Sequence, residues 1–186
     1  SEMCIRDSVG KKYSASDLHA WLEKKRWEKN DDGKPQWKEA QLEMVEIIVR
    51  RMSEELSEHD TGAPVTDPLL WLLHGGPGTG KSEVLKLVKE LFREVCGWEM
   101  DLNYQMVALQ AVMAQLLDGD TIHHALGINP FGTKKDATSA QKASQRQADV
   151  AQRVHQWRWL FIDEISMVSA KLLAEMDLKL RGIMSD

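Results

Sequence analysis

Apolar residues three and four positions apart predict a series of amphipathic helices along this chain. In the second of them, Met44, Val45, Ile48 and Met52 would lie on one face. Residues 127–143 are polar, carry no such pattern and are expected to form a loop. The expected helices are residues 16–29, residues 37–56, a helix from residue 82 to Gly97, a short helix ending at residues 118–119, a polar helix ending near residue 157, and residues 169–183.

Three short, largely apolar runs lie between these helices and predict buried strands. They are residues 69–73, 105–109 and 159–162. A parallel strand that is covered on both faces reads as a continuous apolar run. Strands that alternate with helices indicate an α/β fold, in which helices flank a parallel sheet.

The bulk composition is that of an ordinary folded domain rather than a disordered or membrane-spanning chain. Hydrophobic residues make up 42% and charged residues 28% of the 186 residues, and no apolar run is long enough to cross a bilayer. The net charge of −5 argues against a protein that coats nucleic acid, while binding in a groove remains open. Cys4 and Cys96 match no metal spacing, so we expect reduced thiols of an intracellular protein, whether nuclear, mitochondrial or prokaryotic.

The strongest motif is GGPGTGKS at residues 75–82, a complete match to the phosphate-loop pattern G-x-x-x-x-G-K-[ST]. Glycines let backbone N–H groups turn toward a phosphate, and a helix N-terminus favours an anion. Lys81 would reach the β- and γ-phosphates of ATP, and the Ser82 hydroxyl would ligate Mg²⁺. The expected strand before the loop and helix after it disfavour a chance glycine-rich turn. The residues expected to hold the nucleotide are Gly75, Gly76, Pro77, Gly78, Thr79, Gly80, Lys81 and Ser82.

An apolar strand that ends in two acids supplies the second half of such a site. In LFIDE at residues 160–164, Asp163 would hold Mg²⁺ across from Ser82, because Mg²⁺ prefers hard oxygen ligands. Glu164 would face the γ-phosphate and act as general base toward the attacking water. The alternative is a strand that ends in two solvated acids, but the upstream phosphate loop favours catalysis. Together the two motifs predict an ATPase.

DEISMV at residues 163–168 resembles the second helicase motif of the Pif-one/RecD branch of superfamily 1 DNA helicases. Three other segments fall in the order of that family: the phosphate loop, TIH at residues 121–123, and EAQ at residues 39–41. The resemblance covers about residues 37–184. It implies a first RecA-like ATPase domain over residues 37–186, preceded by a helical and irregular segment over residues 1–36.

The resemblance also assigns roles to single residues. Gln41 would bond the edge of adenine through its amide donor and acceptor, with a surface helix residue as the alternative. Thr121 and His123 would lie near the path of single-stranded DNA or couple it to the ATP site, although His123 fits a structural histidine equally well. Gln110 stands where the family usually has a threonine that contacts the DNA backbone, and an amide can also bond phosphate.

We therefore expect an ATP-dependent 5′–3′ DNA helicase that uses ATP and Mg²⁺, binds single-stranded DNA and acts in DNA repair or recombination. The sequence ends at Asp186, before the second RecA-like domain and arginines of that family, so this chain alone is expected to unwind nothing. Two alternatives remain. An AAA-type ATPase would share Lys81 and the two acids, but the TIH segment would have no expected role in it. A nonenzymatic module would instead bind nucleotide or DNA as a switch.

Overall fold

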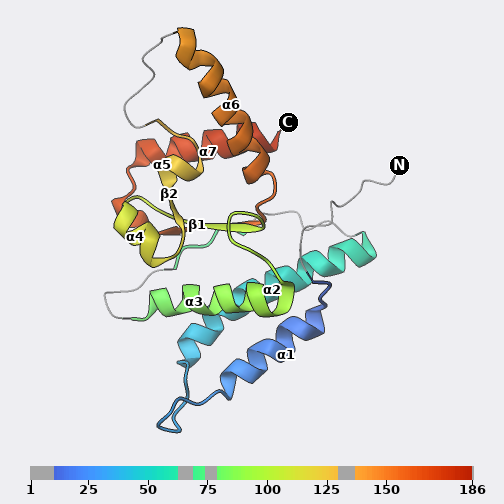
Figure 1. Ribbon diagram of the computed structural model, residues 1–186. Helices are drawn as coiled ribbons and strands as arrows, with labels where there is room; N and C mark the ends of the chain where they lie inside the picture. The colour runs from blue at the N-terminus through green and yellow to red at the C-terminus, as the bar shows by residue number, and fades with distance from the viewer. Residues whose placement is uncertain (1–10, 63–68, 74–78, 130–136, 186) are drawn as a thin grey trace. The chain divides into compact units, whose positions relative to one another are not determined.

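The computed structural model describes residues 11–62, 69–73, 79–129 and 137–185, and the chain divides into two compact units (Figure 1). One unit spans Gly10–Gly97, and the other contains Trp98–Asp186. The domain boundary expected after residue 36, between an N-terminal segment and an ATPase domain, stays a prediction. Within the described ranges, no helix combines the length and the apolar character that crossing a membrane requires.

The unit Gly10–Gly97 is built from helices. These are α1 (Ala15–Arg26), α2 (Glu39–Thr61), α3 (Lys81–Leu91) and a π-helical turn, η1 (Phe92–Cys96), which continues α3. Helix α1 packs against α2, and α2 packs against α3. The apolar spacing predicted each helix, with ends displaced by a few residues. Gly97 ends the last turn, as expected, in a left-handed conformation with φ 63°.

A buried ion pair joins α1 to α3 inside this unit. The Lys25 side chain is 7% exposed, and its Nζ lies 2.6 Å from Glu90 on α3 and 3.1 Å from Glu28. Burial opposes the charged form of the lysine, but the hydrogen bonds to the two carboxylates outweigh it and raise the pKa of Lys25. The indole N–H of Trp21 also reaches across to η1, the continuation of α3, and donates to Glu94 at 2.7 Å. Polar contacts therefore fix α1 against α3, which carries the phosphate-loop lysine.

The strand expected at residues 69–73 is wrong. These residues have no regular secondary structure, and Leu70 and Leu72 are 88% and 62% exposed. A strand persists only where a neighbouring strand takes up its N–H and C=O groups, and no described strand pairs with this segment. An apolar run shows that burial would be favourable, but it does not supply a partner.

The other unit contains a parallel sheet, which confirms the expected α/β fold with helices flanking the strands. Its described strands are β1 (Tyr104–Ala108), β2 (Asp120–Thr121) and β3 (Trp159–Asp163), in the order β2-β1-β3. The runs at residues 105–109 and 159–162 predicted β1 and β3 to within a residue. Strand β2 was not expected, because two residues are too short to show a pattern.

Four α-helices are described in this unit: α4 (Ala111–Leu116), α5 (Ile122–Ala125), α6 (Ala137–Val154) and α7 (Ala170–Met184). The loop expected to extend to residue 143 is wrong at its end, since α6 begins at Ala137. The start of α6 reads ATSAQKASQRQ, and its alanine and glutamine residues favour a helix without adding an apolar face. A pattern search based on apolar spacing therefore misses it.

Helices α5, α6 and α7 supply a core that covers one face of the sheet (Figure 1). The strand residues packed on this core are Val107 of β1 and Leu160 and Ile162 of β3. Residues two apart on a strand point to the same face, so this packing fixes which strand residues face the core. The other buried residues of the core lie on these helices or just after them: Ile122, Ala125, Leu126, Val150, Val154, Trp157, Leu172, Met176 and Ile183.

Replacement of Met176 by alanine should lower the free energy of unfolding by about 2–5 kcal/mol, because it opens a cavity in this core. Met176 is 1% exposed, whereas Leu178 on the same helix is 70% exposed. Leu178→Ala is the matched control and should change stability by no more than about 0.5 kcal/mol. Urea unfolding followed by circular dichroism measures both. Equal losses in the two variants would mean that α7 does not pack through Met176.

Candidate functional site

The phosphate loop leads directly into the N-terminus of α3. Gly75, Gly76, Pro77 and Gly78 lie outside the described residues, while the last four loop residues, Thr79 to Ser82, are described. Gly80 precedes the first helical residue with a left-handed φ of 89°, and Lys81 begins the helix. The first turn of a helix carries unpaired N–H groups and the positive end of the helix dipole. This end of α3 can therefore receive an anion such as a phosphate.

Gln41 lies against the phosphate loop. Its side chain Nε2 donates to the carbonyl oxygen of Gly80 at 3.4 Å, and its Oε1 accepts a hydrogen bond from the Lys38 N–H at 2.9 Å. With 8% of its surface exposed, Gln41 is buried rather than an open surface residue of α2. The structure thus brings together two residues that sequence analysis singled out separately. The bond between Gln41 and adenine stays a prediction.

Asp163 and Glu164 lie where β3 ends. Asp163 is the last residue of the strand and is half-buried, while Glu164 is exposed. The backbone of Glu164 is left-handed, with φ 50° and ψ 48°, and the 3-10 turn η2 (Ile165–Met167) follows it. Because Glu164 leaves the extended conformation, its carboxylate is freed from the alternating pattern of the strand. Two adjacent acids at the end of a strand can thus serve two different roles.

The carboxyl ends of the strands bring several predicted residues to one edge of the sheet. In the register of the sheet, Ala108 pairs with Thr121 of β2 on one side and with Asp163 of β3 on the other. Gln110 follows β1 and precedes α4, and it is exposed. In open α/β sheets, ligands bind beyond the carboxyl ends of the strands. The edge therefore gathers Gln110, Thr121, Asp163 and Glu164 at the position where a ligand is expected.

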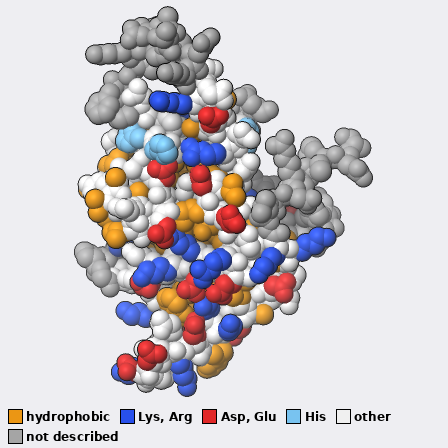
Figure 2. Space-filling model, viewed as in Figure 1, with side chains coloured by type: hydrophobic (Ala, Val, Ile, Leu, Met, Phe, Trp, Pro, Cys, Tyr) orange, Lys and Arg blue, Asp and Glu red, His pale blue; other side chains and the backbone are white. Residues whose placement is uncertain are grey.

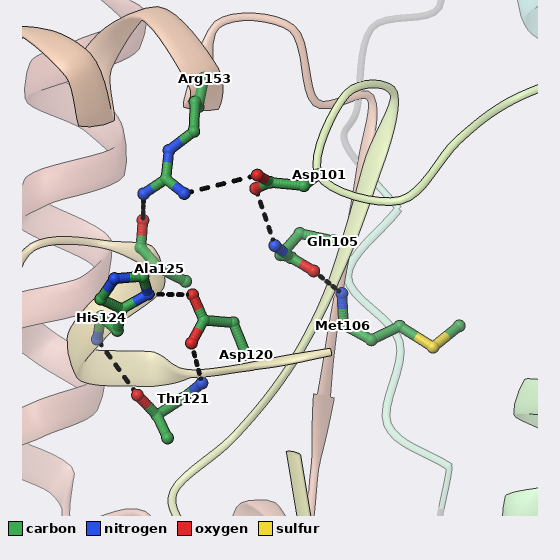
Figure 3. Close-up of polar contacts among 8 residues, drawn as sticks. All are labelled: Asp101, Gln105, Met106, Asp120, Thr121, His124, Ala125 and Arg153. Atoms are coloured by element: carbon green, nitrogen blue, oxygen red, sulfur yellow. Dashed lines mark hydrogen bonds and ion pairs between the residues drawn. The ribbon is translucent and has the colours of Figure 1, made fainter. Parts of the chain in front are cut away.

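Thr121 has a local structural task at this edge (Figure 3). Its Oγ1 accepts a hydrogen bond from the His124 N–H at 3.3 Å and so caps α5, while its own N–H donates to Asp120 Oδ1 at 2.7 Å. Asp120 also pairs through Oδ2 with Nδ1 of His124. The half-buried His123 remains a predicted DNA-coupling residue. Sequence analysis missed the Asp120–His124 pair, although a spacing of four residues across a helix start is a signal for it.

A second polar group, also drawn in Figure 3, joins α6 to the loop before β1. Arg153 of α6 lies 3.4 Å from Asp101 through Nη1, and its Nη2 donates to the carbonyl of Ala125 in α5 at 3.5 Å. Gln105, which is 2% exposed, donates to Asp101 from its Nε2 at 2.9 Å. Arg153 thus connects the helix that follows Thr121 to the body of the unit. No motif marks it, since its partners lie far away in the sequence.

The donor set for Mg²⁺ fits the chemistry of that ion. In the described part of the chain, no group of three or more His, Cys, Asp or Glu residues could hold a metal ion. Mg²⁺ usually keeps several waters and binds through one or two carboxylates together with phosphate oxygens. Ser82 and Asp163 each carry an oxygen ligand of the kind that Mg²⁺ prefers, and they stay predicted ligands.

Gly80→Ala should weaken nucleotide binding and lower stability by about 1–2 kcal/mol, the cost of a left-handed alanine. A Cβ at this position would also lie 2.5 Å from Gln41 Nε2, so the glutamine would have to move. Gly182→Ala in α7 is the control, because no atom lies within 4 Å of its added Cβ. Thermal unfolding and ATP titration measure both variants. Gly80→Ala with unchanged ATP affinity would remove the need for this backbone conformation.

Comparison with known proteins agrees with the geometry. Residues 63–180 match the AAA domain family. The chain is 35% identical over 114 residues to the ATP-dependent DNA helicase PIF1 of Saccharomyces cerevisiae (strain YJM789), which confirms the resemblance to the Pif-one/RecD branch. This match covers 59% of the chain and 12% of the relative, so the chain spans a small part of that protein's length. No solved structure matches the chain. On the match over residues 63–180, the chain belongs to the AAA domain family.

Proposed function

We propose that this chain binds Mg²⁺-ATP and hydrolyses it as the first motor domain of an ATP-dependent DNA helicase. The observation that carries the proposal is the row Thr121–Ala108–Asp163 at the carboxyl edge of the sheet. The row supports the proposal because Asp163, of the acidic pair, and Thr121, of the segment that resembles a DNA-coupling motif, lie on either side of Ala108 at the same edge. The named relative is a DNA helicase, which supports the same assignment. A 5′–3′ direction, an intracellular location and a role in DNA repair or recombination are further parts of the proposal.

Each residue of the proposed site has a distinct chemical task. Lys81 binds the β- and γ-phosphates and stabilises the charge that develops during transfer. Ser82 and Asp163 hold Mg²⁺, which neutralises phosphate charge when bound. Glu164 accepts a proton from the water whose oxygen attacks the γ-phosphorus, and the bond to the β-phosphate oxygen breaks to release ADP. Gln41 selects adenine through its amide.

The motor action requires more than this site. A second RecA-like domain is proposed to complete it with arginines that stabilise the transition state. Single-stranded DNA is the proposed partner, and Gln110, Thr121 and His123 are its proposed contacts or couplers. An AAA-type ATPase without DNA coupling is the second candidate, because the matched family is described as an AAA domain.

Lys81→Ala and Glu164→Gln should separate binding from turnover. Loss of the lysine removes charged hydrogen bonds to phosphate, so Mg²⁺-ATP should bind about 10- to 100-fold more weakly. Glu164→Gln should leave ATP binding within about twofold and lower turnover about 10²- to 10⁴-fold, the usual contribution of a general base. Calorimetric titration and phosphate release are the measurements. Unchanged turnover in Glu164→Gln would exclude Glu164 as the base.

Single-stranded DNA should raise the rate of ATP hydrolysis when the chain is joined to its second RecA-like domain. The physical reason is that DNA held at the sheet edge orders Thr121 and His123 beside the acidic pair. Phosphate release with and without oligothymidylate measures the effect, with duplex DNA as the control. Hydrolysis that is equally fast with and without oligothymidylate would favour the uncoupled AAA-type ATPase.

A further inference from the structure

The hairpin between α1 and α2 is held in one conformation by its own hydrogen bonds. Lys29 and Pro35 form an antiparallel bridge, and the Asn30 side chain accepts hydrogen bonds from the N–H groups of Asp32 at 3.1 Å and Lys34 at 3.0 Å. Gly33, with a left-handed φ of 73°, makes the turn. A surface connection with this many internal contacts presents its side chains in fixed positions.

Two tryptophans flank this hairpin. Trp27 follows α1 and is 76% exposed, which is unusual for so large an apolar side chain. Trp37 lies where the hairpin meets α2, and its indole N–H donates to Glu28 at 3.0 Å. That hydrogen bond is the main cause that lowers the pKa of Glu28, whose carboxylate also lies 3.1 Å from Lys25. The hydrogen bond to Glu28 therefore fixes the indole ring of Trp37, while Trp27 is exposed to solvent.

The two tryptophans line a cavity. Its volume is about 590 Å³, and its walls are Arg26, Trp27, Pro35, Trp37, Lys38 and Glu39. It is a shallow depression, open to solvent, so a ligand would rest on its surface rather than be enclosed. Of its charged walls, Arg26 lies within 3.9 Å of three carboxylates, those of Glu23, Glu39 and Glu46, which balance its charge. Lys38 is the other basic residue of the walls.

Both lysines and acids surround the cavity. Lys29, Lys34 and Lys38 are exposed, and among the described residues none of them is within ion-pair distance of an acid. The hairpin acids Asp31 and Asp32 lie in the turn beyond the Lys29–Pro35 bridge. Figure 2 shows basic, acidic and apolar side chains next to one another where Figure 1 draws this hairpin.

We propose that this hairpin surface, formed by Trp27, Trp37, Lys29, Lys34 and Lys38, binds single-stranded DNA. A base stacks on Trp27 at the mouth of the cavity, and the lysines neutralise the flanking phosphates. Exposed aromatic rings combined with lysines are the means by which proteins hold single strands without reading their sequence. The inference rests on the proposed function for its ligand, and it adds a contact outside every helicase-like motif of the chain.

The three lysines of this surface distinguish between the ligands that could occupy it. A proline-rich peptide would use the tryptophans but would leave three unpaired lysines without a role. The adenine ring of ATP is the other planar candidate. It would stack on a tryptophan but would not need lysines spread along a charged backbone. A single strand of DNA uses the rings and the lysines together, because each nucleotide brings one base and one phosphate.

Fluorescence anisotropy of labelled oligothymidylate with the 186-residue chain tests the proposal. Trp27→Ala should weaken binding about 5- to 100-fold, the usual effect of removing one stacking ring. Trp27→Phe keeps an aromatic face and should restore most of the affinity, whereas Trp27→Leu keeps only apolar area and should not. Because Trp27 is exposed, circular dichroism should show all three variants to be folded.

The lysines have their own readout. Lys34→Gln should reduce the dependence of log K on log salt concentration by about 0.7, the value for one phosphate contact on a single strand. Lys86→Gln is the control, because Lys86 is an exposed lysine of α3 that already pairs with Glu83 at 2.7 Å. It should leave the salt dependence unchanged.

Three results would overturn the proposal. These are oligothymidylate binding that Trp27→Ala leaves intact, full affinity in Trp27→Leu, and ATP binding that Trp27→Ala weakens while DNA binding stays intact. The last result would assign the cavity to adenine. In each case the DNA helicase function would stand, since the wild-type chain still binds the oligonucleotide. If the wild-type chain bound no oligothymidylate at all, both this inference and the DNA partner of the proposed function would fail.

Discussion

The parallel pairing of β1 with both of its neighbours is the constraint on which the candidate site depends. Residues 108, 121 and 163 come from distant parts of the sequence, and only the backbone hydrogen bonds of the sheet align them in one row. The core of α5, α6 and α7 then fixes the faces of the strands, because a shift by one residue would turn Leu160 and Ile162 away from it. Register and packing thus specify together which side chains reach the carboxyl edge.

In the helical unit, polar side-chain contacts align segments that are distant in the sequence. The buried Lys25 connects α1 to α3, and Gln41 connects α2 to the residue that precedes α3. Loss of one partner would leave a buried polar group without its hydrogen bond, so both contacts favour one arrangement of the helices. The N-terminal helix is therefore physically part of the unit that carries Lys81, although the motifs begin only after it. The same Lys25 supports Glu28 and, through it, Trp37 at the hairpin.

Sequence analysis predicted most helices and two of the strands because their apolar periods are long enough to be distinctive. It could not predict the contact between Gln41 and Gly80, which are 39 residues apart, since no period relates them. The strand predicted at residues 69–73 is absent, because hydrophobicity indicates that burial is favourable but does not show that a neighbouring strand is available for pairing. The start of α6 was not predicted, because its alanine and glutamine residues favour a helix but form no apolar face that a search for periodicity would detect. The phosphate loop and the acidic pair were identifiable from their own sequence pattern, and the other candidate residues from the family resemblance, whereas their hydrogen-bond partners were not.

The backbone of Glu164 has one more consequence. The other described non-glycine residues with positive φ are Asp101 and Asp118, and aspartate tolerates this conformation better than glutamate does. A glycine or asparagine at position 164 would suit the turn better and should make the fold more stable. The chain instead keeps a long acidic side chain at a place where the backbone disfavours it. If Glu164 has the proposed role, stability and activity compete at this position, and selection for more stable variants would tend to remove the carboxylate proposed as the general base.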